Sequence, residues 1–213
     1  MKKLVITLIF AISGKILLAQ YDPKALEVLD AMSKRYKAVP AFEANISYTL
    51  TNEIEKIDEE FKGKMVVKGD KYSLVLPEQE VINDGKTLWT YLPEAKEVNI
   101  DNFDPNSDDL NPSKIFDVYK KGFKYLHMGD ATEGGVICDV VDLVPEKKDA
   151  QYFKIRMNIG KKDKSIQNFI MFDRSGNKYK YTISKFTPNA SITDSYFMFD
   201  AKNYPGVEVI DLR

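Results

Sequence analysis

Apolar positions change their spacing along this chain, and the changes mark its elements. Over 22–39 they recur every three or four residues, which predicts an amphipathic helix of about four turns. Asp22 is placed to cap this helix, Pro23 suits its first turn, and Pro40 ends the pattern. The apolar face of the predicted helix consists of Ala25, Val28, Leu29, Met32 and Tyr36.

From residue 41 onward, apolar residues alternate with polar ones, as they do in half-buried strands. The stretch "AFEANISYTLT" (41–51) is the clearest example, and Asp84-Gly85 marks a hairpin turn further on. About eleven strands at hairpin spacing follow from this pattern. Beyond the first, the predicted strand segments are 61–67, 72–76, the hairpin 82–93, 96–100, 136–145, 152–159, 166–172, 179–186, 195–200 and 205–212.

A polar segment rich in Asp, Asn and Pro interrupts the strands at 101–113. Asn111 and Pro112 then begin a predicted short helix that ends near Gly122. Because this helix lies between loop segments, it is placed as a movable lid would be. Its apolar residues are Ile115, Phe116 and Tyr119.

Strands joined by hairpins form an antiparallel sheet, and here Lys, Glu, Ser and Thr occupy one face of it. The other face is rich in aromatic residues and methionine, so the two helices must cover part of it. We therefore predict a mainly β fold with helices (α+β). Its centre is an incomplete antiparallel β-barrel of about eleven strands, lidded by short helices around a hydrophobic cavity.

Residues 1–19 differ from the rest of the chain. Lys2 and Lys3 precede the apolar run "LVITLIFAI", and small Ala19 follows, an order that predicts a secretory signal peptide cleaved after Ala19. The alternative, a retained membrane anchor, is disfavoured because the apolar run is too short to span a bilayer. Cleavage leaves one predicted domain over 20–213, exported to the periplasm, with a formal charge of −4 instead of −1 because three lysines are lost.

Composition excludes several classes of function. Of the 213 residues, 44% are hydrophobic and 30% charged, an ordinary balance for a folded globular protein. The formal charge of −1 argues against a nucleic-acid partner, since such domains carry a basic excess. Cys138 is the only cysteine, so an intramolecular disulfide is impossible, and its position rules out N-terminal lipidation of the mature chain.

Residue types that carry enzyme chemistry are scarce in this sequence. His127 is the only histidine, so a cluster of histidines around a metal is impossible, and we expect His127 to be partly buried and structural. The pair Asp108-Asp109 does not fit a calcium-loop spacing and indicates a solvated loop. We therefore predict no enzyme activity, no cofactor and no metal site.

The apolar face of the predicted sheet has two interpretations. Alternating Phe, Tyr and Met residues are more common in a solid core than in a ligand cavity. However, methionine and aromatic side chains also adapt to variable guests, and the predicted helix at 112–121 is placed to cover a hollow.

Four stretches occur in a characteristic order along the chain. The strand "AFEANISYTL" is followed by "FKGKMVVKGDKY", by the hairpin "DGKTLWTY" with Pro93 after it, and by "FMFDAKNYPGVEVIDL" at the end. Together they cover nearly all of the predicted mature chain and resemble the periplasmic outer-membrane lipoprotein carrier family, the LolA-like proteins. The resemblance implies an incomplete barrel lidded by helices, whose hydrophobic cavity carries lipoprotein acyl chains across the periplasm.

The resemblance also implies partners. These are acylated lipoproteins as cargo, an inner-membrane ATP-driven lipoprotein release complex that supplies them, and an outer-membrane acceptor, and we expect the chain to be a monomer. One departure concerns Lys68-Gly69, where the family often has an Arg-Pro pair whose arginine is implicated in holding the lid shut. If Lys68 is equivalent, the charge remains but the planar fork of donors is lost; if Gly69 is equivalent, no donor remains.

Strand parity assigns side chains to the expected cavity. Trp89 and Tyr91 are predicted to line it, with Leu88 on the opposite face of the sheet. The full predicted lining is Ile46, Tyr48, Leu50, Met65, Val67, Tyr72, Leu74, Trp89, Tyr91, Met157, Phe169 and Met171. The predicted lid residues are Ile115, Phe116, Tyr119 and Lys68.

Two rival functions keep the same fold. One is a periplasmic carrier of glycolipid or free fatty acid. The other is an envelope-stress sensor that detects stray lipoproteins by binding a membrane regulator. Such sensors usually carry an additional domain, for which this sequence leaves no residues.

Overall fold

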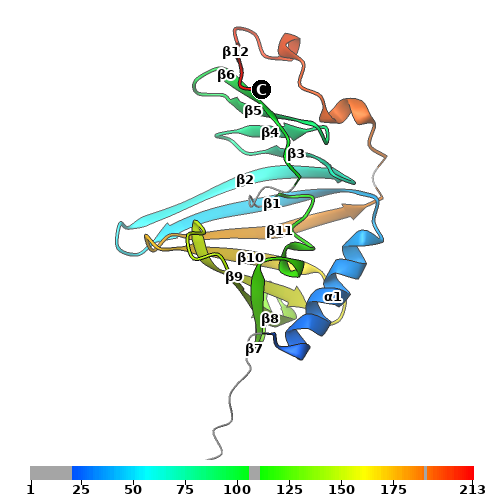
Figure 1. Cartoon of the computed structure of the whole chain (residues 1–213), viewed down its shortest axis with the longest axis vertical. Helices are drawn as coiled ribbons and strands as arrows, with labels where there is room; N and C mark the ends of the chain where they lie inside the picture. Colours follow the sequence, from blue (N-terminus) through cyan, green and yellow to red (C-terminus); the bar gives the residue numbers. More distant parts are fainter. Residues whose placement is uncertain (1–20, 106–110, 190) are drawn as a thin grey trace, which may run out of the picture.

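The computed structural model describes residues 21–105, 111–189 and 191–213. In this part of the chain, one α-helix, three short 3₁₀ helices and a single twelve-stranded sheet are present (Figure 1). The helical elements are α1 (Pro23–Lys37), η1 (Val118–Lys120), η2 (Asp194–Phe197) and η3 (Ala201–Asn203). The strands are β1 (Ala41–Asn52), β2 (Ile57–Lys68), β3 (Lys71–Val75), β4 (Glu80–Asn83), β5 (Thr87–Leu92), β6 (Glu97–Asn102), β7 (Phe123–Glu133), β8 (Val136–Pro145), β9 (Tyr152–Gly160), β10 (Ile166–Asp173), β11 (Lys178–Pro188) and β12 (Glu208–Asp211).

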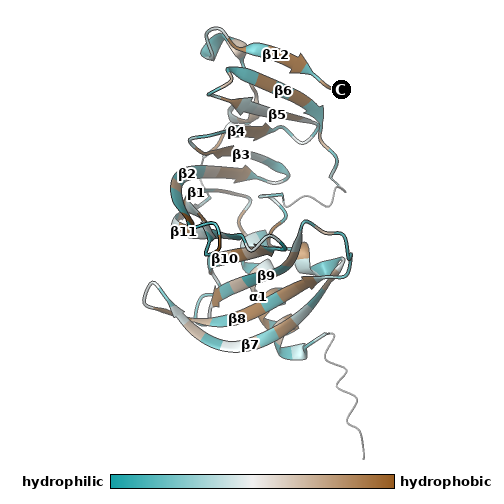
Figure 2. Ribbon diagram, turned by 90° about the vertical axis from the view of Figure 1, so that its left-hand side faces the viewer, coloured by the Kyte–Doolittle hydropathy of each residue, from teal (hydrophilic) through white to brown (hydrophobic). Residues whose placement is uncertain are grey.

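The sheet is open, with the strand order β12-β6-β5-β4-β3-β2-β1-β11-β10-β9-β8-β7. Each strand pairs antiparallel with its neighbours, except that β12 runs parallel to β6. Figure 2 shows how the sheet bends between its two ends, with β3–β6 and β12 above and β7–β9 below. The predicted fold class, a mainly β protein built on an antiparallel barrel that does not close, is confirmed.

Helix α1 forms where the apolar spacing predicted it. The carboxylate of Asp22 accepts hydrogen bonds from the backbone N–H groups of Lys24 (2.8 Å) and Ala25 (3.4 Å), and Pro23 occupies the first turn. Three basic residues in the last turn complement the helix dipole. The buried face carries all five predicted apolar residues, so α1 packs as an amphipathic helix against the sheet.

The sheet has two faces that differ in what covers them. We call the face that carries Ile46, Met65 and Met157 the inner face, because it packs with α1 and with residues 115–119 in one hydrophobic core. Directly paired residues point to the same side of a sheet, so the ladder fixes which residues share this face. The opposite, outer face is covered near β3–β5 by residues 191–207, which we call the C-terminal segment and in which Phe197 is completely buried.

Residues 111–121, which we call the roof segment, do not form the predicted α-helix. Three successive turns of the 3₁₀ type replace it, closed by bonds from Lys114 N to Asn111 O (2.9 Å), Asp117 N to Lys114 O (2.9 Å) and Lys120 N to Asp117 O (3.0 Å). Asn111 still caps the start of the segment, accepting from the backbone N–H of Ser113 at 2.9 Å. Few α-helical bonds are possible in so short a segment, so tertiary contacts decide its conformation.

The predicted strand at 195–200 is also wrong, because the segment contains η2 instead. Its alternating apolar residues reflect packing across the outer face rather than pairing at a sheet edge: Phe197 is buried while Tyr196 and Met198 are exposed. The chain crosses the outer face in this way before it adds β12 to the far edge, and this crossing accounts for the parallel pairing of β12 with β6.

Candidate functional site

A cavity of about 110 Å³ lies on the inner face beneath the roof segment. Strands on both sides of the β1–β11 pair provide its walls, and the roof segment covers it. The residues that line it are Ile46, Met65, Leu74, Asn111, Pro112, Ile115, Phe116, Ile166, Phe169, Met171, Tyr181 and Ile183. With one amide among twelve lining residues, the cavity suits an apolar guest and offers no arrangement for acid–base or nucleophilic chemistry.

The structure brings together part of the predicted lining. Five of the predicted wall residues and two of the predicted lid residues line the cavity: Ile46, Met65, Leu74, Phe169, Met171, Ile115 and Phe116. Tyr48 lies beside it, paired with the lining residue Tyr181, and Leu50 shares the same face. Val67, Tyr72 and Met157 instead belong to the buried core around the cavity.

A row of aromatic side chains continues the cavity wall across four strands. Phe169, Tyr181, Tyr48 and Phe61 are direct cross-strand partners on β10, β11, β1 and β2. Their ring centroids are 4.8 Å, 5.0 Å and 5.9 Å apart in that order. All four remain partly exposed, so the inner face offers an open aromatic surface next to the roofed cavity.

Three wall residues, Ile166, Tyr181 and Ile183, were not singled out from the sequence. For Tyr181 and Ile183 the signal was present, because "YKYTIS" (179–184) alternates in the same way as the first strand. The pairs Tyr48 with Tyr181 and Ile46 with Ile183 place them on the inner face.

The prediction for Trp89 and Tyr91 is wrong in its choice of face. Leu74 pairs with Val81, and Val81 pairs with Thr90, so the neighbours of Thr90 on β5 point to the outer face. Tyr91 packs there against Tyr204, with ring centroids 4.6 Å apart. Leu88, predicted on the opposite face, is the residue of this strand that packs against the inner core.

The roof segment is fastened to α1 by an aromatic stack and a polar cluster. The rings of Phe116 and Tyr36 are 3.9 Å apart and nearly parallel. Asp117 accepts a hydrogen bond from Ser33 (2.5 Å) and pairs with the ammonium groups of Lys37 (2.7 Å) and Lys120 (2.8 Å). Next to this cluster, Tyr119 donates to Asp30.

The electrostatics of this cluster favour a charged Asp117. Partial burial alone would raise the pKa of Asp117, but hydrogen bonds from Lys120, Lys37 and Ser33 outweigh it and lower the pKa to about 2. The phenol of Tyr119 has a raised pKa, because of its burial and then because of its bond to Asp30, and it therefore remains a donor at neutral pH.

Comparison with known proteins agrees with this geometry. The sequence profile of the family described as "Outer membrane lipoprotein carrier protein LolA" matches residues 39–200. The chain belongs to this family. The resemblance inferred from the hairpin and the closing stretch is thereby confirmed.

Solved structures share the fold of this LolA-family chain at low sequence identity. An uncharacterized conserved protein from Thermus thermophilus matches with a TM-score of 0.59 and 13% identity, covering 88% of this chain and 99% of that one. The Mycobacterium tuberculosis lipoprotein LppX matches with a TM-score of 0.50 and 10% identity, covering 81% and 98%. No functionally curated protein matches the sequence.

Lys68 does not contact the roof of this LolA-family chain, contrary to its predicted role in the lid. Its ammonium group binds the backbone oxygen of Ile192 (2.9 Å) and the carboxylate of Asp194 (2.8 Å), which Lys71 also binds at 2.8 Å. Since Val67 points inward, the next residue must point outward, and Lys68 therefore fastens the C-terminal segment to the outer face. Hydrogen bonds from Lys68 and Lys71 lower the pKa of Asp194 to about 2.

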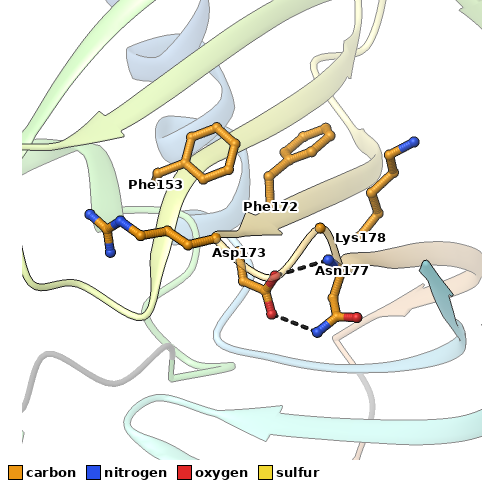
Figure 3. A pocket seen from close by; sticks show the side chains of 7 residues that line it. Phe153, Phe172, Asp173, Asn177 and Lys178 are labelled. Atoms are coloured by element: carbon orange, nitrogen blue, oxygen red, sulfur yellow. Dashed lines mark hydrogen bonds between the residues drawn. The ribbon is translucent and has the colours of Figure 1, made fainter. Parts of the chain in front are cut away.

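A second depression, of about 480 Å³, opens on the outer face around Phe153 and Phe172 (Figure 3). It is larger than the inner cavity but shallow, and its polar groups are already bonded. Asp173 accepts from the backbone N–H of Asn177 at 2.9 Å, and Lys178 pairs with Glu53. The inner cavity is therefore the better candidate for the functional site.

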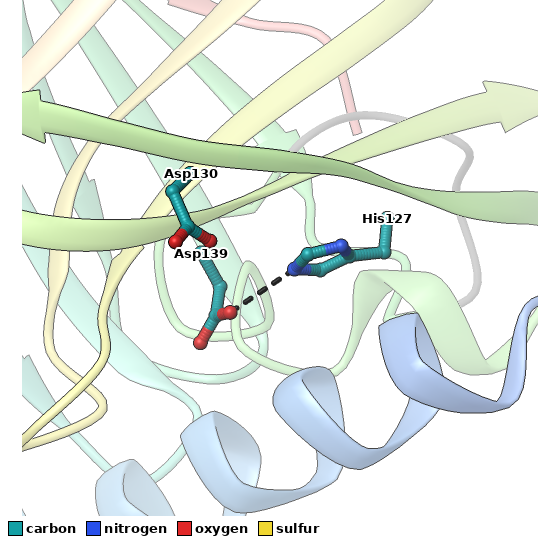
Figure 4. Close-up of side chains that lie close together, drawn as sticks. All are labelled: His127, Asp130 and Asp139. Carbon is teal, nitrogen blue, oxygen red and sulfur yellow. Dashed lines mark hydrogen bonds and ion pairs between the residues drawn. The ribbon is translucent and has the colours of Figure 1, made fainter.

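His127 lies in a polar cluster at the α1 end of the sheet (Figure 4). Its Nε2 is 3.0 Å from the carboxylate of Asp139, and its Nδ1 accepts from the backbone N–H of Gly129 at 3.3 Å. Donor atoms of His127, Asp130 and Asp139 lie within 4.8 Å of one another, a spacing that could hold a metal ion. However, the ammonium of Lys161 already sits 2.6 Å from Asp130, so the arrangement is an ion-pair network with a structural histidine.

Two further predictions concern residues outside the described part of the chain, namely the signal peptide at 1–19 and the loop pair Asp108-Asp109. Within the described part, no helix combines the length and the apolar character needed to cross a membrane.

Proposed function

We propose that this chain is a periplasmic carrier that binds the acyl chains of lipoproteins against its inner face and moves them from the inner to the outer membrane. The observation that carries the proposal is the aromatic and methionine-rich inner face, which is partly exposed beside a cavity covered by the roof segment. Membership of the LolA family supports this use of the inner face.

The hydrophobic effect is sufficient to drive binding of an acyl chain, and no catalytic group is needed. Removing an acyl chain from water is worth about 0.8 kcal/mol per methylene, so a sixteen-carbon chain gains roughly 12 kcal/mol from an apolar environment. A carrier must also release its guest, and rings and thioethers that adapt to a guest bind it without requiring ideal packing. The wall residues Met65, Phe169 and Met171 are of this type.

The roof segment must move for such a guest to enter. The cavity measures about 110 Å³, whereas pockets that enclose drug-sized ligands measure about 300–1,000 Å³. Displacing the roof joins the cavity to the aromatic row and lengthens the available surface. The free energy of breaking the roof contacts is then subtracted from the binding free energy, which favours delivery to an acceptor.

The proposed partners follow from this role. Acylated lipoproteins are the cargo, an inner-membrane ATP-driven release complex loads the carrier, and an outer-membrane acceptor unloads it. The test is depletion of the protein in cells, followed by fractionation of the membranes. We expect outer-membrane lipoproteins to accumulate at the inner membrane, and their timely arrival at the outer membrane would refute the proposal.

The inner face would also accept the acyl chains of a glycolipid or a free fatty acid. Mass spectrometry of the material that copurifies with the protein separates these cases, because a lipoprotein leaves an acylated peptide whereas the others leave only lipid. Recovery of glycolipid or fatty acid alone would favour the rival carrier function.

A further inference from the structure

Charged residues are divided unevenly between the two ends of the sheet. Strands β12, β6, β5, β4, β3, β2 and β1 are consecutive neighbours in it, and β11, β10, β9, β8 and β7 complete it. The first group and the C-terminal segment belong to residues 41–105 and 191–213, which contain 18 acidic and 9 basic residues. The second group, α1 and the roof segment belong to residues 21–40 and 111–189, which contain 12 acidic and 19 basic residues.

The formal charges of these two parts are therefore −9 and +7. We call them the acidic half and the basic half, and they lie at opposite ends of the molecule, with β12 at the top and β7 at the bottom of Figure 1. The formal charge of −1 for the whole chain conceals this separation. A field of this kind orients a protein toward a surface of opposite charge.

The carboxylates of the basic half are largely engaged in bonds within it. Asp142 pairs with Arg156 at 2.7 Å, and Asp130 pairs with Lys161 at 2.6 Å. Several lysines, by contrast, form no ion pair in the part of the chain that the structure describes. They include Lys24, Lys34, Lys121, Lys124, Lys162 and Lys185. The excess positive charge of this half is therefore available to an external partner.

Two of the unpaired lysines lie at the seam where the roof segment meets α1. The ammonium group of Lys120 is 3.4 Å from the hydroxyl oxygen of Ser33. Lys34 follows Ser33 on α1, Lys121 follows Lys120 at the end of the roof segment, and both lysines are exposed. The contact between their neighbours therefore brings these two unpaired cations to the same seam.

The carboxylates at this seam are outnumbered. Asp117 is shared between Lys37 at 2.7 Å and Lys120 at 2.8 Å. Asp30 accepts a hydrogen bond from the phenol of Tyr119. With the two unpaired lysines included, four ammonium groups are present beside two carboxylates, so the seam has a net positive charge.

The chemical type of the available cations indicates the surface that they fit. The basic half contains 16 lysines and three arginines, and the arginines are already bonded, Arg156 to Asp142 and both Arg35 and Arg174 to backbone oxygens. Protein–protein interfaces are enriched in arginine and depleted in lysine, which is a flexible point charge. Unpaired lysines therefore fit a fluid layer of phosphate groups better than a fixed pattern of carboxylates on a protein.

We propose that the basic half docks on the surface of a membrane that contains anionic phospholipids, with the seam between α1 and the roof segment against the headgroups. The inference goes beyond the proposed function, because it adds the lipid surface itself as a partner and requires no cargo. In a carrier, this orientation would also bring the roof segment, which must move for a guest to enter, to the bilayer where the guest is exchanged.

The experiment measures cosedimentation of the chain with large vesicles of POPC alone or of POPC with about one third POPG. The chain is purified from the periplasm of an expressing bacterium, and its mass verifies that the predicted signal peptide is absent. We expect binding to the vesicles with POPG and not to POPC alone at about 0.1 M salt, where the Debye length is about 10 Å. Binding should be lost at about 1 M salt, where that length is about 3 Å.

Two matched double variants locate the docking surface. Lys34→Gln/Lys121→Gln removes two charges from the seam, whereas Lys86→Gln/Lys202→Gln removes two from the acidic half, and all four lysines are exposed. Each lysine close to an anionic surface contributes about a fivefold change in affinity, so the seam variant should bind about 25-fold more weakly. The control variant, with the same net charge, should keep its affinity within about twofold. Circular dichroism verifies that both variants fold.

Three results would overturn the proposal. One is failure of the unmodified chain to bind vesicles with POPG, or equal binding to POPC alone. Another is an equal loss of affinity in the two double variants, which would show that net charge decides and not the basic half. The third is retention on immobilised polyglutamate, dependent on the seam lysines, without vesicle binding, which would assign the basic half to an acidic protein. Since no cargo takes part, docking can fail while the carrier role stands, and the carrier role can fail while docking stands.

Discussion

Asp117 holds the roof segment against α1, and its replacement by asparagine should loosen the roof without altering its shape. Asparagine has nearly the same size and can still accept the hydrogen bond from Ser33. What disappears is the negative charge that pairs with Lys37 at 2.7 Å and with Lys120 at 2.8 Å. The Asp117→Asn variant therefore tests whether this charge controls opening of the cavity.

The free energy that the roof contacts lose in this variant can be derived from the pKa of the Asp117 carboxyl group. A pKa of about 2 against an ordinary 3.8 corresponds to about 2.5 kcal/mol in favour of the charged form. The side chain of Asp117 is 33% exposed, so water and salt screen its ion pairs. We take about 1 kcal/mol as the effective loss, which is roughly a fivefold increase in the ratio of open to closed roof.

Hydrogen–deuterium exchange of the backbone amides at 111–121 measures this opening. We expect exchange in the Asp117→Asn variant to be about fivefold faster there and unchanged in β8 and β9. Affinity for the acyl lipid 1-monopalmitoylglycerol, measured by equilibrium dialysis, should rise by up to the same factor, since less free energy is spent on opening. Asp211→Asn is the matched control, because that carboxyl also has a pKa of about 2 but pairs with Arg213 at the far edge of the sheet.

Two results would contradict the reasoning. Unchanged exchange at 111–121 would show that the charge of Asp117 does not hold the roof. Faster exchange together with weaker lipid binding would show that the roof contacts the guest favourably and does not oppose its entry.

The remaining predictions concern pH, the cavity wall and the packing of the two faces. Because the folded-state pKa of Asp117 is lowered, its contribution is complete above about pH 5 and is lost as the pH falls toward 2, so exchange at 111–121 should accelerate over that window. Met171→Gln places an amide in the cavity wall and should weaken lipid binding about tenfold, whereas Ile170→Gln on the outer face of the same strand should leave dialysis results unchanged. Phe197→Ala removes a completely buried ring and should lower the free energy of unfolding by about 3–5 kcal/mol in urea titrations, with lipid affinity retained by the folded fraction. Gly63→Ala would place a Cβ atom 2.4 Å from the backbone oxygen of Val75, so it should destabilise the fold by about 1–3 kcal/mol in the same titration.

Elements whose signals are local could be predicted from the sequence. The N-cap residue Asp22 directly precedes α1, whose apolar residues recur at helical spacing. Along the sequence of β1, apolar and polar residues alternate. Part of the cavity wall followed from the same alternation, because Ile46, Met65 and Met171 share a face with the apolar residues two positions away on their strands.

The choice of face at β5 could not be predicted, because alternation groups residues without saying which side is inside. The sequence correctly placed Trp89 with Tyr91 on one face. In this end of the sheet, however, the more apolar face is the outer one, where Trp89 pairs with Ile82 and Ile100 and the C-terminal segment supplies the cover. Of the two inner positions at β4, one carries Val81 and the other carries Asn83, whose amide donates to the backbone oxygen of Asp70.

The contacts between the roof segment and α1 could not be predicted either, because they join residues far apart in the sequence. Asp117 meets Ser33 and Lys37, which are about eighty residues away in sequence, and nothing near residue 117 indicates that contact. Lys68 could have been placed correctly from parity alone, since it follows the inward residue Val67.

Site-specific photo-crosslinking in growing cells tests the central claim most directly. A benzophenone amino acid is introduced at position 169 on the inner face or at position 91 on the outer face, and the cells are fed an alkyne-labelled fatty acid to mark acylated proteins. We predict that irradiation links labelled lipoproteins to the chain substituted at Phe169 and not to the chain substituted at Tyr91. Equal labelling at both positions, or labelling at Tyr91 alone, would contradict the assignment of the inner face as the acyl-binding surface.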